Sequence, residues 1–357
     1  MMNNNFMDAK NVLKNAYTFM VVLEAVGCNP NGDPDLANAP RQDFETGLGI
    51  ITDVATKRRI RNYVEAAYAD QPGMEILMQS GTSINKEIAK AVLEANGLET
   101  FTKDFKNKKV DDSSALIAKR YWDARTFGAV LATGRNAGQL NGPVQFGMAM
   151  SVDPVHVENI TITRMCYTDG KDFNSLKEYE NEELSRPEDK KRTMGDKKFV
   201  SYGLYVVQGT VSANLAAKTG FTESDLQVLF EAIMQMYDFD NTSSKQGMRI
   251  ASPLIIFKHI GTHPEDPEQN AREALLGCAP AHKLYDMLKI RRKAGVEFGR
   301  KLDDYDITLE FSDEMRNTLR GVNIGMKELP FSDIVWKNDD ENEFFKTAEA
   351  NGLTIVK

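Results

Sequence analysis

The chain has 357 residues, of which 41% are hydrophobic and 27% charged, and its net charge is −8 at neutral pH. This composition excludes a wholly disordered chain, and no apolar run is long enough to predict a membrane-spanning helix. The acidic balance argues against a general nucleic-acid binder, but 44 lysines and arginines remain available for a local basic groove.

The chain contains three cysteines, Cys28, Cys166 and Cys278, which are widely separated and form no CxxC pair. An odd number of scattered cysteines is typical of a reducing compartment and supplies no zinc knuckle. Residues 1–8 lack the charged segment and the following apolar segment of a secretory signal. We therefore expect a soluble, cytoplasmic protein without a membrane partner, a metal or another cofactor.

Near the N-terminus, a polar loop connects an alternating apolar strand to a basic helix. The strand is predicted from Tyr17 to Val26, the loop from Asn29 to Asp35, and the helix from Thr52 onwards. Several folds that bind single-stranded nucleic acid use this order of elements to bring phosphates onto a sheet. The segment therefore points to a nucleic-acid interface.

The basic helix has a predicted buried side and a predicted charged side. At 3.6 residues per turn, the buried stripe is Thr56, Ile60, Tyr63 and Ala67. Lys57, Arg58 and Arg61 lie on another arc, in the first turns, where the helix dipole disfavours cations by a few tenths of a kcal/mol each. A bound polyanion would offset that cost. A solvated basic face is the other explanation of the cluster.

A glycine-rich polar segment spans residues 128–142. It lacks the Lys-Ser/Thr pair of a Walker loop, and a strand follows it where a dinucleotide site needs a helix. Nucleotide hydrolysis is therefore disfavoured. Close approach of this backbone to a nucleic-acid strand remains open, with Arg135 and Gln139 as candidate donors.

Residues 168–198 are highly charged with few apolar positions, which predicts an exposed arm. Other elements are predicted around it: strands at 144–152, 160–164, 199–212 and 248–257, a helix at 84–95 ended by Gly97, and a helix at 223–237 opened by Thr222. Without the insertions, the order is strand, helix, strand, strand, helix, strand. This order is typical of an α+β fold of the ferredoxin-like, RNA-recognition type.

Catalytic patterns are weak. The four histidines form no recognisable pair with a nucleophile. His259 and His263 have an i,i+4 spacing, but Gly261 and Pro264 argue against the helix that a metal site of this spacing needs. Asp33 is the one loop carboxylate at the end of a predicted strand, and it equally suits a turn.

Taken together, several segments resemble the Cas-seven backbone subunit of CRISPR interference complexes, in particular its type I-C branch. The segments are Asn29-Pro30-Asn31-Gly32-Asp33-Pro34-Asp35, Thr52-Asp53-Val54 with Lys57-Arg58 and Ile60-Arg61-Asn62-Tyr63, Arg125-Thr126-Phe127-Gly128, Gly138-Gln139 with Gly142-Pro143-Val144-Gln145, Ser151-Val152-Asp153-Pro154, and Met194-Gly195. In this order they cover roughly residues 15–260.

The resemblance implies a modified RNA-recognition-motif fold, α+β and βαββαβ, shaped like a hand. The implied divisions are a palm core at 15–70, 123–167 and 199–260, a helical, finger-like insertion at 71–122, a thumb-like arm at 168–198, and a C-terminal extension at 261–357 that packs on the core.

The resemblance also implies roles for single residues. Lys57 and Arg61 would grip guide-RNA phosphates, with Thr52 just ahead of them, and Met194 at the thumb base would be a wedge against a displaced nucleotide. The full predicted RNA-binding set is Asn31, Arg41, Thr52, Lys57, Arg58, Arg61, Arg135, Gly138, Gln139, Met194, Lys197 and Lys198. Because the aromatic signature of RNA-recognition motifs is missing around Phe199 and Tyr202, we expect backbone gripping more than base stacking.

The expected function is a non-catalytic scaffold whose copies stack along one CRISPR guide RNA. Target DNA would be bound through pairing with the guide. Further partners would be the guide-processing cap subunit and the large subunit of the complex. The alternative is a metal-dependent ribonuclease, because backbone subunits of related type III complexes cut RNA with an aspartate in the loop after the first strand. Asp33 or Asp35 would take that place here.

Overall fold

The structure, a computed structural model, describes residues 11–168 and 170–356. Residues 1–8, where the sequence lacks a secretory signal, lie outside the described residues, as do residue 169 of the predicted arm and residue 357. The fold is mixed α+β, as predicted, and is built on a ten-stranded antiparallel sheet. Within the described ranges, no helix has the length and apolar character needed to cross a membrane.

The sheet has the strand order β16-β15-β12-β1-β10-β8-β4. These strands are β1 (Tyr17–Cys28), β4 (Leu48–Ile51), β8 (Ala149–Pro154), β10 (Thr193–Val211), β12 (Leu254–His259), β15 (Val322–Lys327) and β16 (Val335–Trp336). Three more strands pair beside this path: β7 (Val144–Phe146) and β9 (Val157–Arg164) with β10, and β11 (Met248–Ile250) with β1.

β1 lies at the centre of the sheet because its side chains are apolar on both faces. Phe19 and Val21 belong to one core cluster, and Met20 belongs to a second cluster on the opposite face. The register is antiparallel on both sides, with Val21 opposite Val207 of β10 and Phe19 opposite Ile256 of β12. A strand buried on both faces needs cover from two layers.

One layer consists of α1 (Asp53–Tyr68) and α7 (Glu223–Phe239). α1 begins after Thr52 and buries Thr56, Ile60, Tyr63 and Val64. The predicted stripe is wrong at its last position, because Ala67 is exposed and the helix buries Val64 instead. α7 begins after Thr222, as predicted, where Thr222 and Asp225 form a capping box.

The second layer is C-terminal. It comprises α8 (Pro267–Leu276), α9 (Ala281–Tyr285), α10 (Asp313–Thr318), α11 (Glu341–Ala350) and a small sheet of β13 (Leu288–Arg292), β14 (Tyr305–Glu310) and β17 (Leu353–Val356). Leu309 and Phe344 of this layer share a core cluster with Met20 and Phe257. The sheet face opposite α1 and α7 is therefore buried by the chain itself.

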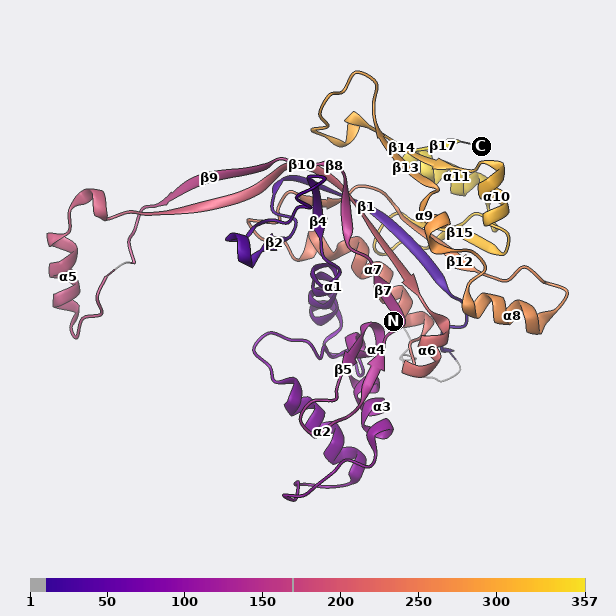
Figure 1. Cartoon of the computed structure of the whole chain (residues 1–357), viewed down its shortest axis with the longest axis horizontal. Coiled ribbons are helices and arrows are strands. Elements are labelled where there is room, and N and C mark those ends of the chain that lie inside the picture. Colours follow the sequence, from indigo (N-terminus) through magenta and orange to yellow (C-terminus); the bar gives the residue numbers. More distant parts are fainter. Residues whose placement is uncertain (1–10, 169, 357) are drawn as a thin grey trace.

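A helical lobe hangs below α1 in Figure 1. It consists of α2 (Ile84–Asn96), α3 (Val110–Arg120), α4 (Trp122–Phe127) and a hairpin of β5 (Gly128–Val130) and β6 (Gln139–Asn141). The predicted end of α2 is confirmed, because Gly97 caps the helix with φ +65°.

The arm is a two-stranded ribbon that projects sideways from the sheet (Figure 1). β9 and the first half of β10 pair from Val157 and Val200 outwards, and α5 (Leu176–Ser185) lies beyond the ribbon. β10 begins at Thr193, earlier than the predicted 199. Two predicted strands are each split, 144–152 into β7 and β8, and 248–257 into β11 and β12. Pro253, which cannot donate a ladder hydrogen bond, lies in the second break.

Candidate nucleic-acid interface

The loop after β1 is tied to the start of α1 through Asn31. The Oδ1 of Asn31 accepts hydrogen bonds from the Thr52 backbone N and the Thr52 Oγ1, both at 3.0 Å. Thr52 in turn accepts from the backbone N of Ala55, which caps the helix. The backbone N of Arg41 donates to the Asn31 carbonyl at 2.9 Å. The loop is thus fixed against a helix N-terminus, which carries a partial positive charge.

Asp33 is occupied by the turn in which it lies. Its Oδ2 pairs with Arg41 at 3.1 Å, and its Oδ1 accepts from the backbone N of Asp35 at 3.1 Å. Among residues 11–168 and 170–356, no group of three or more His, Cys, Asp or Glu side chains is placed to hold a metal ion. The sequence interpretation of Asp33 as a turn-former agrees with these contacts.

Two lysines donate to this loop, and a third donates to the segment beside it, where Ser244 accepts from the backbone N of Asn29. Lys245 Nζ donates to the carbonyls of Asn29 and Pro30, and Lys198 Nζ donates to the Leu36 carbonyl at 3.2 Å. Lys197 Nζ donates at 3.3 Å to the Ser243 carbonyl, in the segment that also carries Lys245. Their acceptors are main-chain carbonyls, and no described carboxylate forms an ion pair with any of the three.

We call residues 29–41, Thr52, Lys197, Lys198 and Lys245 the loop platform. Carbonyls do not neutralise an ammonium charge, so the three lysines keep the charge that a polyanion requires. Burial, and to a smaller degree the charge of Arg59, lowers the pKa of Lys245 to about 8. Sequence reasoning missed Lys245, because the polar loop that carries it has no periodicity and no motif.

The helix cations are placed differently from the sequence expectation. Lys57 pairs with Asp53 at 3.1 Å, and its side chain is only 12% exposed. Arg61 pairs at 2.7 Å with Asp123, which is 1% exposed. Arg58 donates to the Met78 carbonyl at 2.7 Å. The expectation that these cations project away from the packed structure is therefore corrected. Arg58 and Arg61 connect α1 to neighbouring segments, and Lys57 pairs within the helix while its ammonium lies 5.8 Å from the centre of the Phe127 ring.

The glycine-rich segment lies in the helical lobe. Arg135 stacks over the Phe101 ring at 4.1 Å, and Gly138 adopts φ +81°. Gln139 is exposed and donates to the Asn141 side chain at 3.0 Å. In Figure 1, β5 lies beside α4, away from β2 (Gly32–Asp33) of the loop platform. These residues form a second, separate group.

Met194 lies on the ribbon of the arm. It pairs with Thr163 of β9, and its side chain is 74% exposed. The structure therefore brings together Asn31, Arg41, Thr52, Lys197 and Lys198 of the predicted set. It places Lys57 and Arg61 together beside Phe127, and leaves Arg135, Gly138, Gln139 and Met194 elsewhere.

Comparison with known proteins identifies the family. The sequence profile of the family described as CRISPR-associated protein Cas7 matches residues 15–310. A protein of Haloferax volcanii named CRISPR-associated protein Cas7 is 26% identical over 241 residues, which is 60% of this chain and 62% of that protein. The chain thus spans somewhat less than two thirds of the length of this curated relative.

Two solved structures are similar to the fold. One, titled CRISPR RNA-guided surveillance complex, pre-nicking, has a TM-score of 0.41 and 16% identity over 68% of this chain and 78% of that chain. The other, titled CRISPR RNA-guided surveillance complex, has a TM-score of 0.37 and 15% identity over 84% of this chain and 89% of that chain. The profile match extends over most of the sequence, and on that ground the chain belongs to the CRISPR-associated protein Cas7 family.

Proposed function

We propose that this chain is a guide-RNA-binding scaffold subunit that polymerises along CRISPR RNA in a type I-C surveillance complex. The observation that carries the proposal is the loop platform, where Lys197, Lys198 and Lys245 lie beside a helix N-terminus without a carboxylate partner among the described residues. Family membership supports the same proposal. The type I-C assignment rests on the succession of sequence motifs.

The platform would hold the guide by its phosphates. In RNA-recognition motifs, bases stack on the sheet face opposite the helices. Here Tyr202 on that face packs against Tyr305 of the C-terminal layer, with ring centroids 6.2 Å apart. Because Tyr202 and Leu204 are buried in this contact, base stacking on the sheet is disfavoured and backbone gripping is favoured. We also propose that β12-β1-β10-β8 with α1 and α7 is a modified RNA-recognition fold.

The remaining roles follow from the same assignment. Residues 15–70, 123–167 and 199–260 would form the palm, 71–122 the finger-like insertion, 168–198 the thumb, and 261–357 the extension. The thumb would interrupt the guide, with Met194 as the wedge that displaces a nucleotide. The bases between wedges would pair with target DNA. Neighbouring copies, the cap subunit and the large subunit would be the protein partners, in the cytoplasm.

The direct test is to purify the protein from its host and sequence any bound RNA. Short RNAs that share one repeat-derived end are expected, and a protein free of RNA would contradict the proposal. A second test replaces Lys197, Lys198 and Lys245 by alanine, with the exposed Lys346→Ala as matched control. We expect weaker binding for every RNA sequence and a smaller salt slope, by about 0.7 for each phosphate that is no longer neutralised. An unchanged salt slope would exclude the loop platform as the site that binds RNA phosphates.

The ribonuclease alternative predicts a different result. Guide-paired RNA incubated with the assembled protein and Mg²⁺ or Mn²⁺ would be cut, and Asp33→Ala would stop the cutting. We expect no cleavage dependent on Asp33, because Arg41 and the backbone N of Asp35 already occupy both of its carboxylate oxygens.

A further inference from the structure

The loop between β3 (Ala39–Pro40) and β4 presents one phenyl ring to solvent. Phe44 is 87% exposed, the highest value among the large apolar side chains that the structure describes. Its turn is closed by a backbone bond of 2.8 Å from Gly47 N to the Asp43 carbonyl. The Asp43 carboxylate also accepts from the backbone N of Glu45 at 3.0 Å and from the Thr46 hydroxyl at 2.9 Å.

The turn is anchored to the body of the protein. The backbone N of Val155 donates to the Gly47 carbonyl at 3.0 Å, and Gln42 Nε2 donates to the Val155 carbonyl at 2.7 Å. Gly47 has φ +72°, and a Cβ there would lie 3.2 Å from Pro154. An exposed apolar side chain on a mobile loop carries little information. The backbone of the turn that carries Phe44 is instead held in place before any partner arrives, which lowers the entropic cost of using Phe44 as an anchor.

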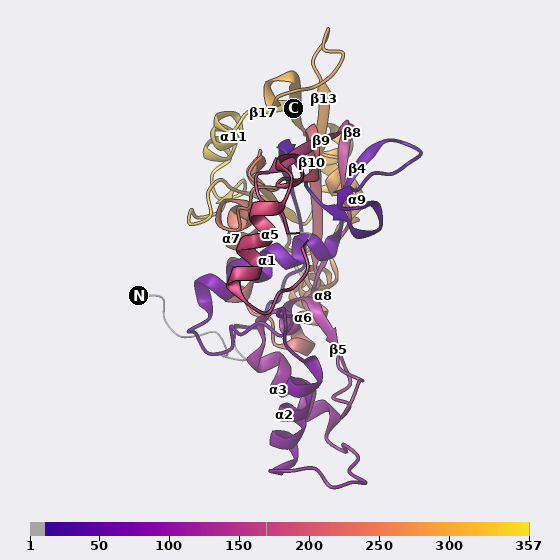
Figure 2. The same cartoon turned by 90° about the vertical axis from the view of Figure 1, so that its left-hand side faces the viewer.

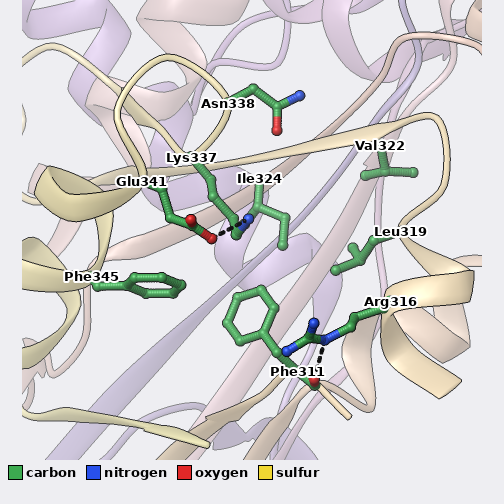
Figure 3. Close-up of a pocket in the computed structure, with 9 residues that line it drawn as sticks. All are labelled: Phe311, Arg316, Leu319, Val322, Ile324, Lys337, Asn338, Glu341 and Phe345. Atoms are coloured by element: carbon green, nitrogen blue, oxygen red, sulfur yellow. Dashed lines mark hydrogen bonds and ion pairs between the residues drawn. The ribbon is translucent and has the colours of Figure 1, made fainter. Parts of the chain in front are cut away.

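The same chain carries a pocket of about 430 Å³ in its C-terminal layer, lined by apolar, polar and charged side chains. In Figure 3 the rings of Phe311 and Phe345 and the side chains of Leu319 and Ile324 surround one space, and the ion pair of Lys337 with Glu341 lies among them. Arg316 lies at its border. Its Nε donates to the Phe311 carbonyl at 3.2 Å, and its two terminal nitrogens have no partner among the described residues.

The loop and the pocket can be matched in size and in charge. The pocket has room for one phenyl ring, the group that contributes most buried area per side chain in interfaces. Phe44 is followed by Glu45, an exposed carboxylate that forms no ion pair within the described part of the chain. When Phe44 occupies this pocket, Glu45 comes to its border, where Lys337 is already paired with Glu341, so Glu45 needs a further cation. Arg316 supplies that cation.

We propose that Phe44 of one copy inserts into the pocket around Phe311, Leu319 and Phe345 of a second copy, with Glu45 facing Arg316. In Figure 2, β4 and α11 lie on opposite sides of the molecule. The horizontal direction of that view is the shortest axis of the chain. A contact between different patches on opposite sides is heterologous, and it builds an open helical filament when the rotation between copies does not close a ring. The contact rests on the proposed function, because it would join neighbouring subunits on one guide.

The first experiment measures self-association by sedimentation, with and without guide RNA. Phe44→Asp and Phe44→Ala are expected to weaken association roughly tenfold or more, as for the central residues of protein interfaces. Their melting temperatures should match wild type, because Phe44 is outside the core. Affinity for an RNA short enough for one subunit should also be unchanged.

Charge exchange tests the pairing directly. Glu45→Arg and Arg316→Glu are both surface changes, and each alone should weaken association, whereas the double variant should restore it. A mixture of Phe44→Asp chains with Arg316→Glu chains retains one intact pocket and one intact Phe44, so it should form dimers and no longer species. Failure of the double variant to recover, or long filaments in the mixture, would overturn the contact.

Two outcomes separate this contact from the proposed function. If Phe44→Asp weakens binding of the short RNA and leaves protein association intact, Phe44 touches RNA and the inference is wrong, while the scaffold function stands. If wild type binds no RNA, the scaffold function fails. In that case, sedimentation of the RNA-free protein at high concentration still decides whether Phe44 joins two copies.

Discussion

Lys245 is a cation that the fold holds largely away from water. Its unfolded pKa is about 10.4, and burial lowers the folded value to about 8. At pH 7 the side chain is therefore mostly charged, and at pH 9 it is mostly neutral. An ammonium beneath the carbonyls of Asn29 and Pro30 contributes positive potential to the loop platform only in its charged form.

RNA affinity should therefore decrease as the pH rises from 7 to 9. The affinity is lost as Lys245 loses its proton. Lys245→Arg stays charged over this range, so its RNA affinity should depend less on pH. Fluorescence anisotropy at constant ionic strength measures the RNA affinity at each pH. Lys346→Arg is the control, and its affinity should depend on pH as that of wild type does. A wild-type affinity that does not change over this range would show that the charge of Lys245 does not contribute to RNA binding.

His259 is a residue whose protonation should set the acid stability of the chain. It is 3% exposed, and its Nδ1 accepts from the backbone N of Cys278 at 3.0 Å. Burial lowers its pKa to about 4, against about 6.5 in the unfolded chain. Between these values the unfolded chain binds a proton that the folded chain does not. The free energy of unfolding should therefore fall as the pH falls from 6.5 to 4, by at most about 1.4 kcal/mol per pH unit.

Urea denaturation between pH 4 and 7.5 checks this expectation. His259→Asn keeps an acceptor near the Nδ1 position and removes the titration, so its stability should depend less on pH than that of wild type. The exposed His156→Asn should behave as wild type. Equal pH slopes in wild type and His259→Asn would show that another group controls acid unfolding.

At the scale of elements, the Arg125-Thr126-Phe127-Gly128 segment has a structural explanation. Arg125 in α4 is buried and binds Asp225 of α7 through two bonds, Nε to Oδ2 at 3.1 Å and the second guanidinium nitrogen to Oδ1 at 2.8 Å. It also donates to the carbonyls of Ala118 and Gly73. One guanidinium thus joins the helical lobe to the start of α7.

Removing this guanidinium should destabilise the fold strongly. Arg125→Met would leave Asp225 buried without its counter-charge, and we expect a loss of about 3–5 kcal/mol in the free energy of unfolding. Arg120→Met removes an exposed pair with Glu94 and should cost less than about 1 kcal/mol. Chemical denaturation of both variants makes the comparison. Equal losses would show that burial does not increase the contribution of the Arg125 pair to the free energy of unfolding.

The arm should contribute to assembly more than to stability. Its ribbon is exposed along β9, and α5 buries no residue. Thr161 and Asp196 are directly opposite in the ribbon, so an Asn-Gly turn can replace residues 162–195 and keep Lys197 and Lys198. We expect unchanged melting and loss of long assemblies on guide RNA. A large decrease in the melting temperature would show that the arm contributes to the stability of the folded core.

The limits of sequence prediction follow from where the signals lie. The strand at 17–26 and the helices after Thr52 and Thr222 have local signals, namely alternation, periodicity and capping residues, and all three are present. The arm begins with β9 at Val157, earlier than the predicted residue 168. The sequence of β9 is typical of a strand in a packed sheet, so its exposure could not be predicted from the pattern. The convergence of Lys197, Lys198 and Lys245 depends on contacts between distant segments, which a pattern along the chain does not contain.

At the scale of the whole molecule, the central sheet is closed on both faces. α1 and α7 cover one face, and the C-terminal layer covers the other through Leu309, Phe344 and Tyr305. β15 also extends the sheet by pairing with β12. Which face a C-terminal segment covers cannot be read from its sequence. Because both faces of the sheet are covered, an RNA bound as proposed would have to contact the loops and edges of the sheet.

The C-terminal segment should therefore be required for folding. A chain that ends at residue 260 would expose the apolar face that carries Met20, Ile255 and Phe257 and would leave β12 without its β15 partner. A large exposed apolar face and an open sheet edge both favour aggregation. We expect this chain to be insoluble, or to bind ANS and lack a cooperative transition in urea, whereas the chain with the shortened arm unfolds cooperatively. If the chain ending at residue 260 unfolded cooperatively and bound RNA as wild type does, the palm would be an independent domain and residues 261–357 an attachment to it.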